Sequence, residues 1–77
     1  MTLAQLKKGE IGIISEVNTD AIPLKLLEMG CLPGNFVSLV QVAPFGCPLY
    51  YIINDSHVAI RLETANQIEI SLEKSTF

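Results

Sequence analysis

Short segments rich in β-branched and aromatic residues recur along the chain, separated by segments rich in Gly, Pro, Asn and Asp. Residues of the first kind favour extended backbone and those of the second favour turns. The last apolar segment, residues 68–72, alternates strictly between apolar and polar, which predicts a strand with one buried face. Five strands are predicted in all, over residues 10–17, 36–42, 49–53, 57–62 and 68–72.

One segment has the pattern of an α-helix. Short polar side chains at residues 18–20 can accept the first free N–H groups of a helix, and Pro23 is tolerated in a first turn. The helix is predicted from Ile22 to Met29, and Gly30 follows where a left-handed residue would end it.

The connections carry turn chemistry of their own. Residues 32–35 have Pro and Gly at the two central positions of a type II turn, and Asn54–Ser56 makes a tight link between two strands. Ala43–Pro48 is a stiff loop with two prolines around a glycine, and Gly12 suggests a bulge or bend inside the first strand. Residues 63–67 predict a brief turn or one turn of 3₁₀ helix.

Five short strands and one short inserted α-helix in 77 residues predict a mostly-β fold, a small closed or nearly closed barrel that is SH3-like or OB-like. At the N-terminus, Leu3 and Leu6 would share one face of a turn that Gly9 closes. We expect a single domain over residues 1–77, with a core from about 2 to 72 and a frayed tail from Glu73 to Phe77.

Composition narrows the function classes. Hydrophobic residues make up 49% of the chain and charged residues 17%, which leaves apolar surface that so small a barrel cannot bury. The net charge of −3 and the single or paired placement of Lys and Arg argue against binding to nucleic acid. The sequence shows no signal peptide or membrane-spanning run, so we expect a soluble cytoplasmic protein with reduced thiols.

Candidate chemistry is sparse. No spacing typical of a metal site, a nucleophile with its base, or a phosphate-binding loop is present, so no catalytic residue, metal ligand or cofactor is predicted. Cys31 and Cys47 lie beside apolar residues and are expected to be buried thiols that pack as small hydrophobes. His57 begins a strand after a turn, where a hydrogen-bonding role is expected.

The order of motifs resembles the FeoA family, small cytosolic proteins of bacterial ferrous-iron transport. The similarity covers roughly residues 2 to 72, and each motif is weak alone but specific in combination. The matching motifs are Leu3-x-x-Leu6-Lys7-x-Gly9-Glu10, Leu26-Leu27-Glu28-Met29-Gly30, Leu32-Pro33-Gly34, Ala43-Pro44-Phe45-Gly46-x-Pro48, and Ala59-Ile60-Arg61 with Ala65 and Ile68-x-Ile70.

The resemblance implies an SH3-like barrel with a helix between its first two strands. It also implies action with FeoB, a ferrous-iron permease that has a cytoplasmic GTP-binding domain. Two features depart from the family. Only Lys25 supplies a cation before the Leu-Leu-Glu-Met-Gly motif, where other members carry several Arg, and Asn54-Asp55 replaces a Gly-rich turn. The first departure weakens any docking scheme that needs a basic helix face.

The helix and its flanks are the predicted partner surface. At helical spacing Leu24, Leu27 and the turn to Cys31 would face the barrel. Lys25, Leu26 and Met29 would lie partly outside, unless the two apolar side chains pack under neighbouring loops.

Further candidate residues lie on and beyond this helix. Phe45 offers an aromatic contact on a stiff loop, and one of Tyr50 and Tyr51 should be exposed. Arg61 would pair with Glu63, Glu28 or a C-terminal carboxylate, or else face the partner. The predicted partner-binding residues are therefore Leu24, Lys25, Leu26, Glu28, Met29, Phe45 and Arg61.

These features predict an accessory protein that is not an enzyme. It would dock on the cytoplasmic part of a FeoB-type permease to promote or regulate Fe²⁺ uptake, reaching the membrane only through that partner. The alternative is a metal-responsive module that binds a transition-metal ion directly. Exposed apolar surface would also favour weak self-association into a homo-oligomer.

Overall fold

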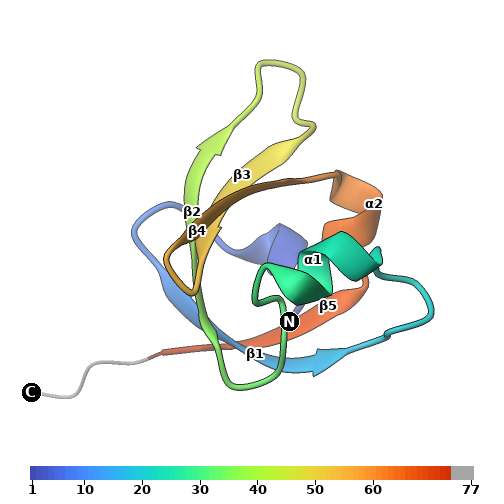
Figure 1. The fold of residues 1–77 in the computed structure, drawn as a ribbon. Coiled ribbons are helices and arrows are strands. Elements are labelled where there is room, and N and C mark those ends of the chain that lie inside the picture. The colour runs from blue at the N-terminus through green and yellow to red at the C-terminus, as the bar shows by residue number, and fades with distance from the viewer. Residues whose placement is uncertain (74–77) are drawn as a thin grey trace, which may run out of the picture.

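The computed structural model describes residues 1–73, and the last part of the predicted frayed tail, residues 74–77, lies outside the described residues. Its strands form one antiparallel sheet in the order β4-β3-β2-β1-β5, which confirms the mostly-β class (Figure 1). The strands are β1 (Ile11–Val17), β2 (Phe36–Val42), β3 (Leu49–Ile53), β4 (Ser56–Ile60) and β5 (Ile68–Leu72).

Two bulges interrupt the ladders of this sheet. The pairing register shifts between Ile14 and Glu16 in β1, and between Leu39 and Gln41 in β2. An extra residue on one strand bends that strand and increases its twist, which helps the sheet curve around its core.

No bulge lies at Gly12, which corrects one of the two features predicted there. Gly12 stays in register with both Val37 and Leu72, but a Cβ there would lie 2.9 Å from the Ile70 Cδ1. A side chain at this position would require the end of the Ile70 side chain to shift, because core side chains approach the backbone closely here.

The core fills the inside of the curved sheet. In β5 the predicted alternation is confirmed over residues 68–71, since Ile68 and Ile70 are buried while Glu69 and Ser71 are exposed; it fails at Leu72, which is exposed at the strand end. Tyr51 is buried and Tyr50 is exposed, and the Tyr51 hydroxyl donates a 3.0 Å hydrogen bond to the Leu3 carbonyl. The buried hydrophobic residues are Leu3, Leu6, Ile14, Ile22, Cys31, Val37, Leu49, Tyr51, Ile53, Val58, Ile60, Ala65, Ile68 and Ile70.

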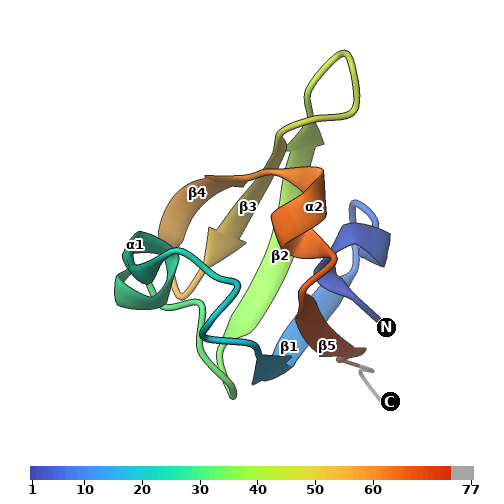
Figure 2. The same cartoon turned by 90° about the vertical axis from the view of Figure 1, so that its right-hand side faces the viewer.

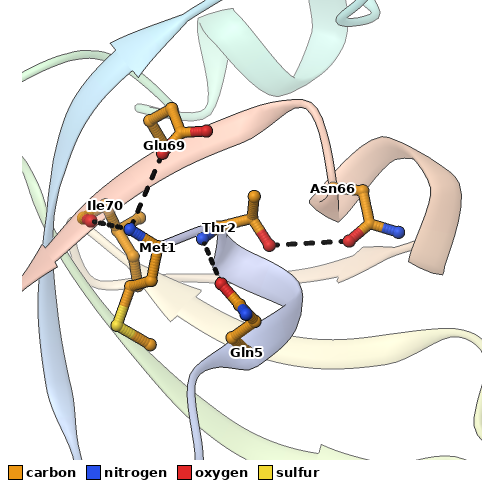
Figure 3. A network of polar contacts seen from close by, with 6 residues as sticks. All are labelled: Met1, Thr2, Gln5, Asn66, Glu69 and Ile70. Atoms are coloured by element: carbon orange, nitrogen blue, oxygen red, sulfur yellow. Dashed lines mark hydrogen bonds and ion pairs between the residues drawn. The ribbon is translucent and has the colours of Figure 1, made fainter.

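The N-terminal segment packs against β5. A 3₁₀ turn, η1 (Leu3–Gln5), buries Leu3, while Thr2 forms an isolated bridge with Glu69. Polar contacts support it: the Gln5 side chain accepts a 2.8 Å bond from the Thr2 N–H, and the Met1 amino group lies 3.7 Å from a Glu69 carboxylate oxygen (Figure 3).

The helix is shorter than predicted. α1 runs from Leu24 to Glu28, because Pro23 has extended backbone (φ −56°, ψ 139°) and stands before the first turn. The polar residues 18–20 do not cap it. Asn18 instead forms its own turn, in which its side-chain oxygen accepts a 3.1 Å bond from the Asp20 N–H.

The end of α1 follows the prediction and forms a Schellman motif. Gly30 has φ +105°, its N–H donates to the Leu27 carbonyl (3.1 Å), and the Cys31 N–H donates to the Leu26 carbonyl (3.0 Å). The Asn35 side chain donates a 2.6 Å bond to the Gly30 carbonyl. These contacts fix where the helix ends relative to β2.

The chain leaves β4 earlier than predicted. β4 ends at Ile60 rather than Leu62, and Arg61 has extended backbone in the N-cap position of a second helix, α2 (Leu62–Ala65). The brief turn predicted over residues 63–67 is therefore one turn of α-helix that starts earlier. It buries Ala65, which is 0% exposed.

Candidate functional site

A groove runs between α1 and β4. Figure 2 shows the two elements side by side at one edge of the barrel. The groove has a volume of about 390 Å³ and is lined by Pro23, Lys25, Leu26, Met29, His57, Val58, Ala59, Ile60, Arg61 and Thr64.

The groove has an apolar base. Leu26 and Met29 are half-buried and pack against the core from the α1 side, while Val58 and Ile60 are buried on the β4 side. The alternative in which Leu26 and Met29 pack inward is therefore the better description, although both still line the groove. The Schellman motif positions Met29, because it fixes the turn directly after that residue.

The groove follows the edge of β4. Four successive β4 residues, from His57 to Ile60, line it. Successive side chains of a strand point to opposite faces of the sheet, so a surface that meets all four must reach the strand from its edge. Within residues 1–73, β4 is the terminal strand of the sheet and pairs with β3 alone.

The titratable groups that line the groove are all basic: Lys25, His57 and Arg61. The whole chain carries a net charge of −3, so this edge differs in sign from the molecule as a whole. Arg61 lies 4.0 Å from Glu63, as one predicted alternative had it, but both side chains are 79% exposed. So exposed a pair is weak and leaves the guanidinium free to meet a partner.

Four of the predicted partner-binding residues meet here: Lys25, Leu26, Met29 and Arg61. Arg61, directly after β4, adds a second cation to the one that Lys25 supplies from α1. Leu24 and Glu28 are exposed on α1 outside the groove lining. The prediction that Leu24 faces the barrel is wrong, since it is 68% exposed. Leu24 is the first residue of the helix, and Ile22, which precedes the helix, is the residue buried in the core instead.

A second hollow adjoins the groove at Arg61. It has a volume of about 670 Å³, and Arg61 lines both. Cys47 and Pro48, at the base of the β2–β3 loop, form part of its wall with Leu62, Glu63 and Asn66. Phe45 lies on the same loop and is 99% exposed, but it lines neither the groove nor this hollow.

Sequence reasoning missed His57 and Ala59 as groove residues. His57 was expected to form hydrogen bonds, but it is exposed and none involves its side chain within residues 1–73. Ala59 carries no chemical signal at all. These two residues line the groove because β4 is the terminal strand, and the strand order was not predicted from the sequence.

The two cysteines differ in environment. Cys31 is buried as predicted, and burial raises the pKa of its thiol to about 11, which keeps it neutral. Cys47 is exposed, which corrects the expectation of a buried thiol, and its sulfur accepts a 3.3 Å bond from the Leu62 N–H. Within residues 1–73, no three His, Cys, Asp or Glu side chains gather as metal ligands would.

A separate hollow of about 470 Å³ lies at the other end of β2. Ile11 and Phe36 line it together with two acidic residues, Asp55 and Glu73, and it contains none of the predicted partner-binding residues.

Over residues 1–73, neither helix has the length and hydrophobicity needed to span a bilayer.

Comparison with known proteins gives a consistent result. The FeoA domain family matches residues 1–72. Over 76 residues the chain is 38% identical to a Porphyromonas gingivalis protein in which Fe(2+) transport protein A is fused to the Fe(2+) transporter FeoB. The match takes in 97% of this chain but only 9% of the fusion protein.

Two solved structures share the fold. Iron(II) transport protein A from Clostridium thermocellum superposes with a TM-score of 0.82 at 30% identity, covering 94% of this chain and 45% of the other. FeoA from Stenotrophomonas maltophilia, solved with zinc, gives 0.79 at 27% identity and covers 96% of both chains. The latter is described as a prokaryotic SH3 domain protein and a candidate activating factor for ferrous iron transport. The SH3-like barrel is thus confirmed over the OB-like alternative.

Proposed function

Because the chain belongs to the FeoA domain family, we propose that it is an accessory protein of a ferrous-iron uptake system that docks on the cytoplasmic part of a FeoB transporter. The observation that carries this proposal is the fusion protein, in which a segment 38% identical to this chain is covalently joined to FeoB. A covalent link holds two modules at an effective concentration in the millimolar range, which suits partners that meet through a small interface.

The groove between α1 and β4 supports a binding role. It combines a half-buried apolar base with Lys25 and Arg61 at its margin, an arrangement that suits protein recognition. The docking face would include Leu24 and Glu28 beside the groove, with Phe45 as a further contact beyond Arg61. The protein would then work in the cytoplasm and reach the membrane only through FeoB. Weak self-association stays a prediction.

Binding can be measured by titrating the full chain into the cytoplasmic part of FeoB from the same organism. We expect saturable binding that Leu24→Ser weakens about tenfold, because this exposed side chain contacts the partner and not the core. Ile11→Ser is the matched control, since Ile11 is also exposed but lies outside the groove. No binding at high micromolar concentration would count decisively against the proposal.

A second candidate is a metal-responsive module, favoured by the zinc complex of the Stenotrophomonas maltophilia relative. Anaerobic titration of the chain with Fe²⁺ or Mn²⁺ tests it. Since no preformed ligand cluster is present within residues 1–73, we expect no heat of binding. A saturable isotherm with one ion per chain would favour the metal-responsive module instead.

A further inference from the structure

The backbone of β4 has one row of hydrogen-bonding groups directed away from the sheet. The β3–β4 hairpin has a two-residue turn, in which Asn54 and Asp55 both have positive φ (49° and 67°). In such a hairpin the residues that flank the turn, Ile53 and Ser56, form a hydrogen-bonded pair.

Hydrogen-bonded and non-bonded pairs alternate from that point along an antiparallel ladder. Val58 and Ile60 therefore bond to β3, whereas the N–H and C=O groups of His57 and Ala59 point outward. Within residues 1–73, no backbone hydrogen bond outside the β3–β4 ladder involves His57 or Ala59. This outer edge borders the groove, since both residues line it.

The surroundings of this edge favour one kind of occupant. Leu26 and Met29 face it from α1 as an apolar wall, and the charged groups on the lining are basic. An extended segment that adds to β4 would form backbone hydrogen bonds with it, and its side chains would point alternately to two sides. Acidic side chains of the segment would pair with Lys25 and Arg61, and apolar side chains would pack against the apolar wall.

We propose that β4 binds its partner by strand addition, accepting an extended segment with acidic and apolar side chains as a sixth strand along His57 and Ala59. The inference rests on the proposed function, because it takes that segment to belong to the cytoplasmic part of FeoB. Backbone bonds would supply affinity, and Lys25 and Arg61 would select for acidic partners.

Amide hydrogen exchange on the full chain tests the backbone contacts. In the free protein we expect the amides of His57 and Ala59 to exchange fast and those of Val58 and Ile60 to be protected. Adding the cytoplasmic part of FeoB should slow exchange at His57 and Ala59 at least roughly tenfold and leave Val58 and Ile60 little changed.

Charge variants test the selection for acidic side chains. The double variant Lys25→Glu with Arg61→Glu should weaken binding roughly tenfold or more, and binding by the unmodified protein should weaken as salt is raised. The control is Lys7→Glu with Lys8→Glu, which changes the net charge equally. These lysines lie between η1 and β1, away from α1 (Figure 2).

The outcomes separate the two proposals. Binding without protection at His57 and Ala59 overturns strand addition and leaves docking on FeoB intact. Equal weakening by both double variants overturns the role of Lys25 and Arg61. Protection of His57 and Ala59 that grows with concentration in the free protein assigns the edge to a second copy of the chain. Absence of any binding overturns docking, and strand addition with it.

Discussion

Burial in the barrel core changes how easily individual side chains lose a proton. Cys31 and Tyr51 are each 1% exposed, and burial raises the pKa of both groups because the interior disfavours their charged forms. Cys47 is also a free thiol, but it is exposed on the surface. The contrast between the two thiols makes Cys31 a probe of core integrity.

Burial of Cys31 predicts a loss of stability at high pH. The pKa of its thiol rises from 9.0 in the unfolded chain to about 11 in the folded protein. The contribution is complete below pH 9, and it is lost as pH rises toward 11 because the unfolded state then releases its proton first. Between about pH 8 and pH 11 we expect the native protein to lose about 2 kcal/mol more than Cys31→Ala does.

Urea unfolding across this pH range measures that difference. Cys47→Ala serves as the control, because it also removes a thiol but takes no group out of the core. Tyr51 contributes in the same direction in every variant, so it cancels from the comparison. Parallel profiles for the native protein and Cys31→Ala would contradict the prediction.

At the scale of elements, turn chemistry sets how strands are joined and where edges fall. The Asn54–Asp55 turn determines which β4 residues form backbone hydrogen bonds with β3, and so which residues direct their N–H and C=O groups toward the groove. The Asn and Asp side chains tolerate the left-handed region, which explains how the chain makes this turn without glycine.

The backbone at Asp55 predicts opposite effects for two substitutions. With φ at 67°, Asp55→Gly should raise the free energy of unfolding by up to about 1 kcal/mol, because glycine is unstrained there. Asp55→Ala should lower it by about 1 kcal/mol, since a Cβ without a polar group gains nothing in this region. Chemical denaturation compares both with the native protein, and equal stabilities for the two variants would refute the argument.

Over the whole molecule, apolar composition and small size leave hydrophobic side chains in solvent. Leu24 and Phe45 are the most exposed of them, at 68% and 99%. Neither of them lines the groove or the neighbouring hollow, whereas Arg61 lines both. The molecule thus has exposed apolar groups as well as a groove lined by two cations, in a chain whose net charge is −3.

Phe45 allows binding to be separated from folding. Phe45→Ala should change the stability by less than about 0.5 kcal/mol, because the side chain touches no core residue. We expect it to weaken binding to the cytoplasmic part of FeoB about tenfold, as is typical of an aromatic anchor. Leu72→Ala is the control, because Leu72 is exposed at the end of β5 and lines neither the groove nor the hollow beside it. Unchanged affinity would remove Phe45 from the docking face.

The sequence by itself determined the strands, the turns and the family. Local chemistry is sufficient there: positive φ at Gly30, Gly34 and Asn54 follows from residue type, and the alternation in β5 shows its buried face. Boundaries differed at two positions, because the sequence placed Pro23 inside the first turn of the helix and Arg61 inside a strand. Only their extended backbone places them before α1 and α2.

The tertiary structure alone decided what the candidate site is made of. The groove joins Lys25 to Arg61 across a long stretch of sequence, and it takes in Ala59 only because β4 is the terminal strand. Sequence periodicity assigned Leu24 to the core, but the start of α1 placed Ile22 there instead. Which backbone groups stay unpaired depends on strand order and register, and these are set by how the whole chain buries its apolar residues and not by any local pattern.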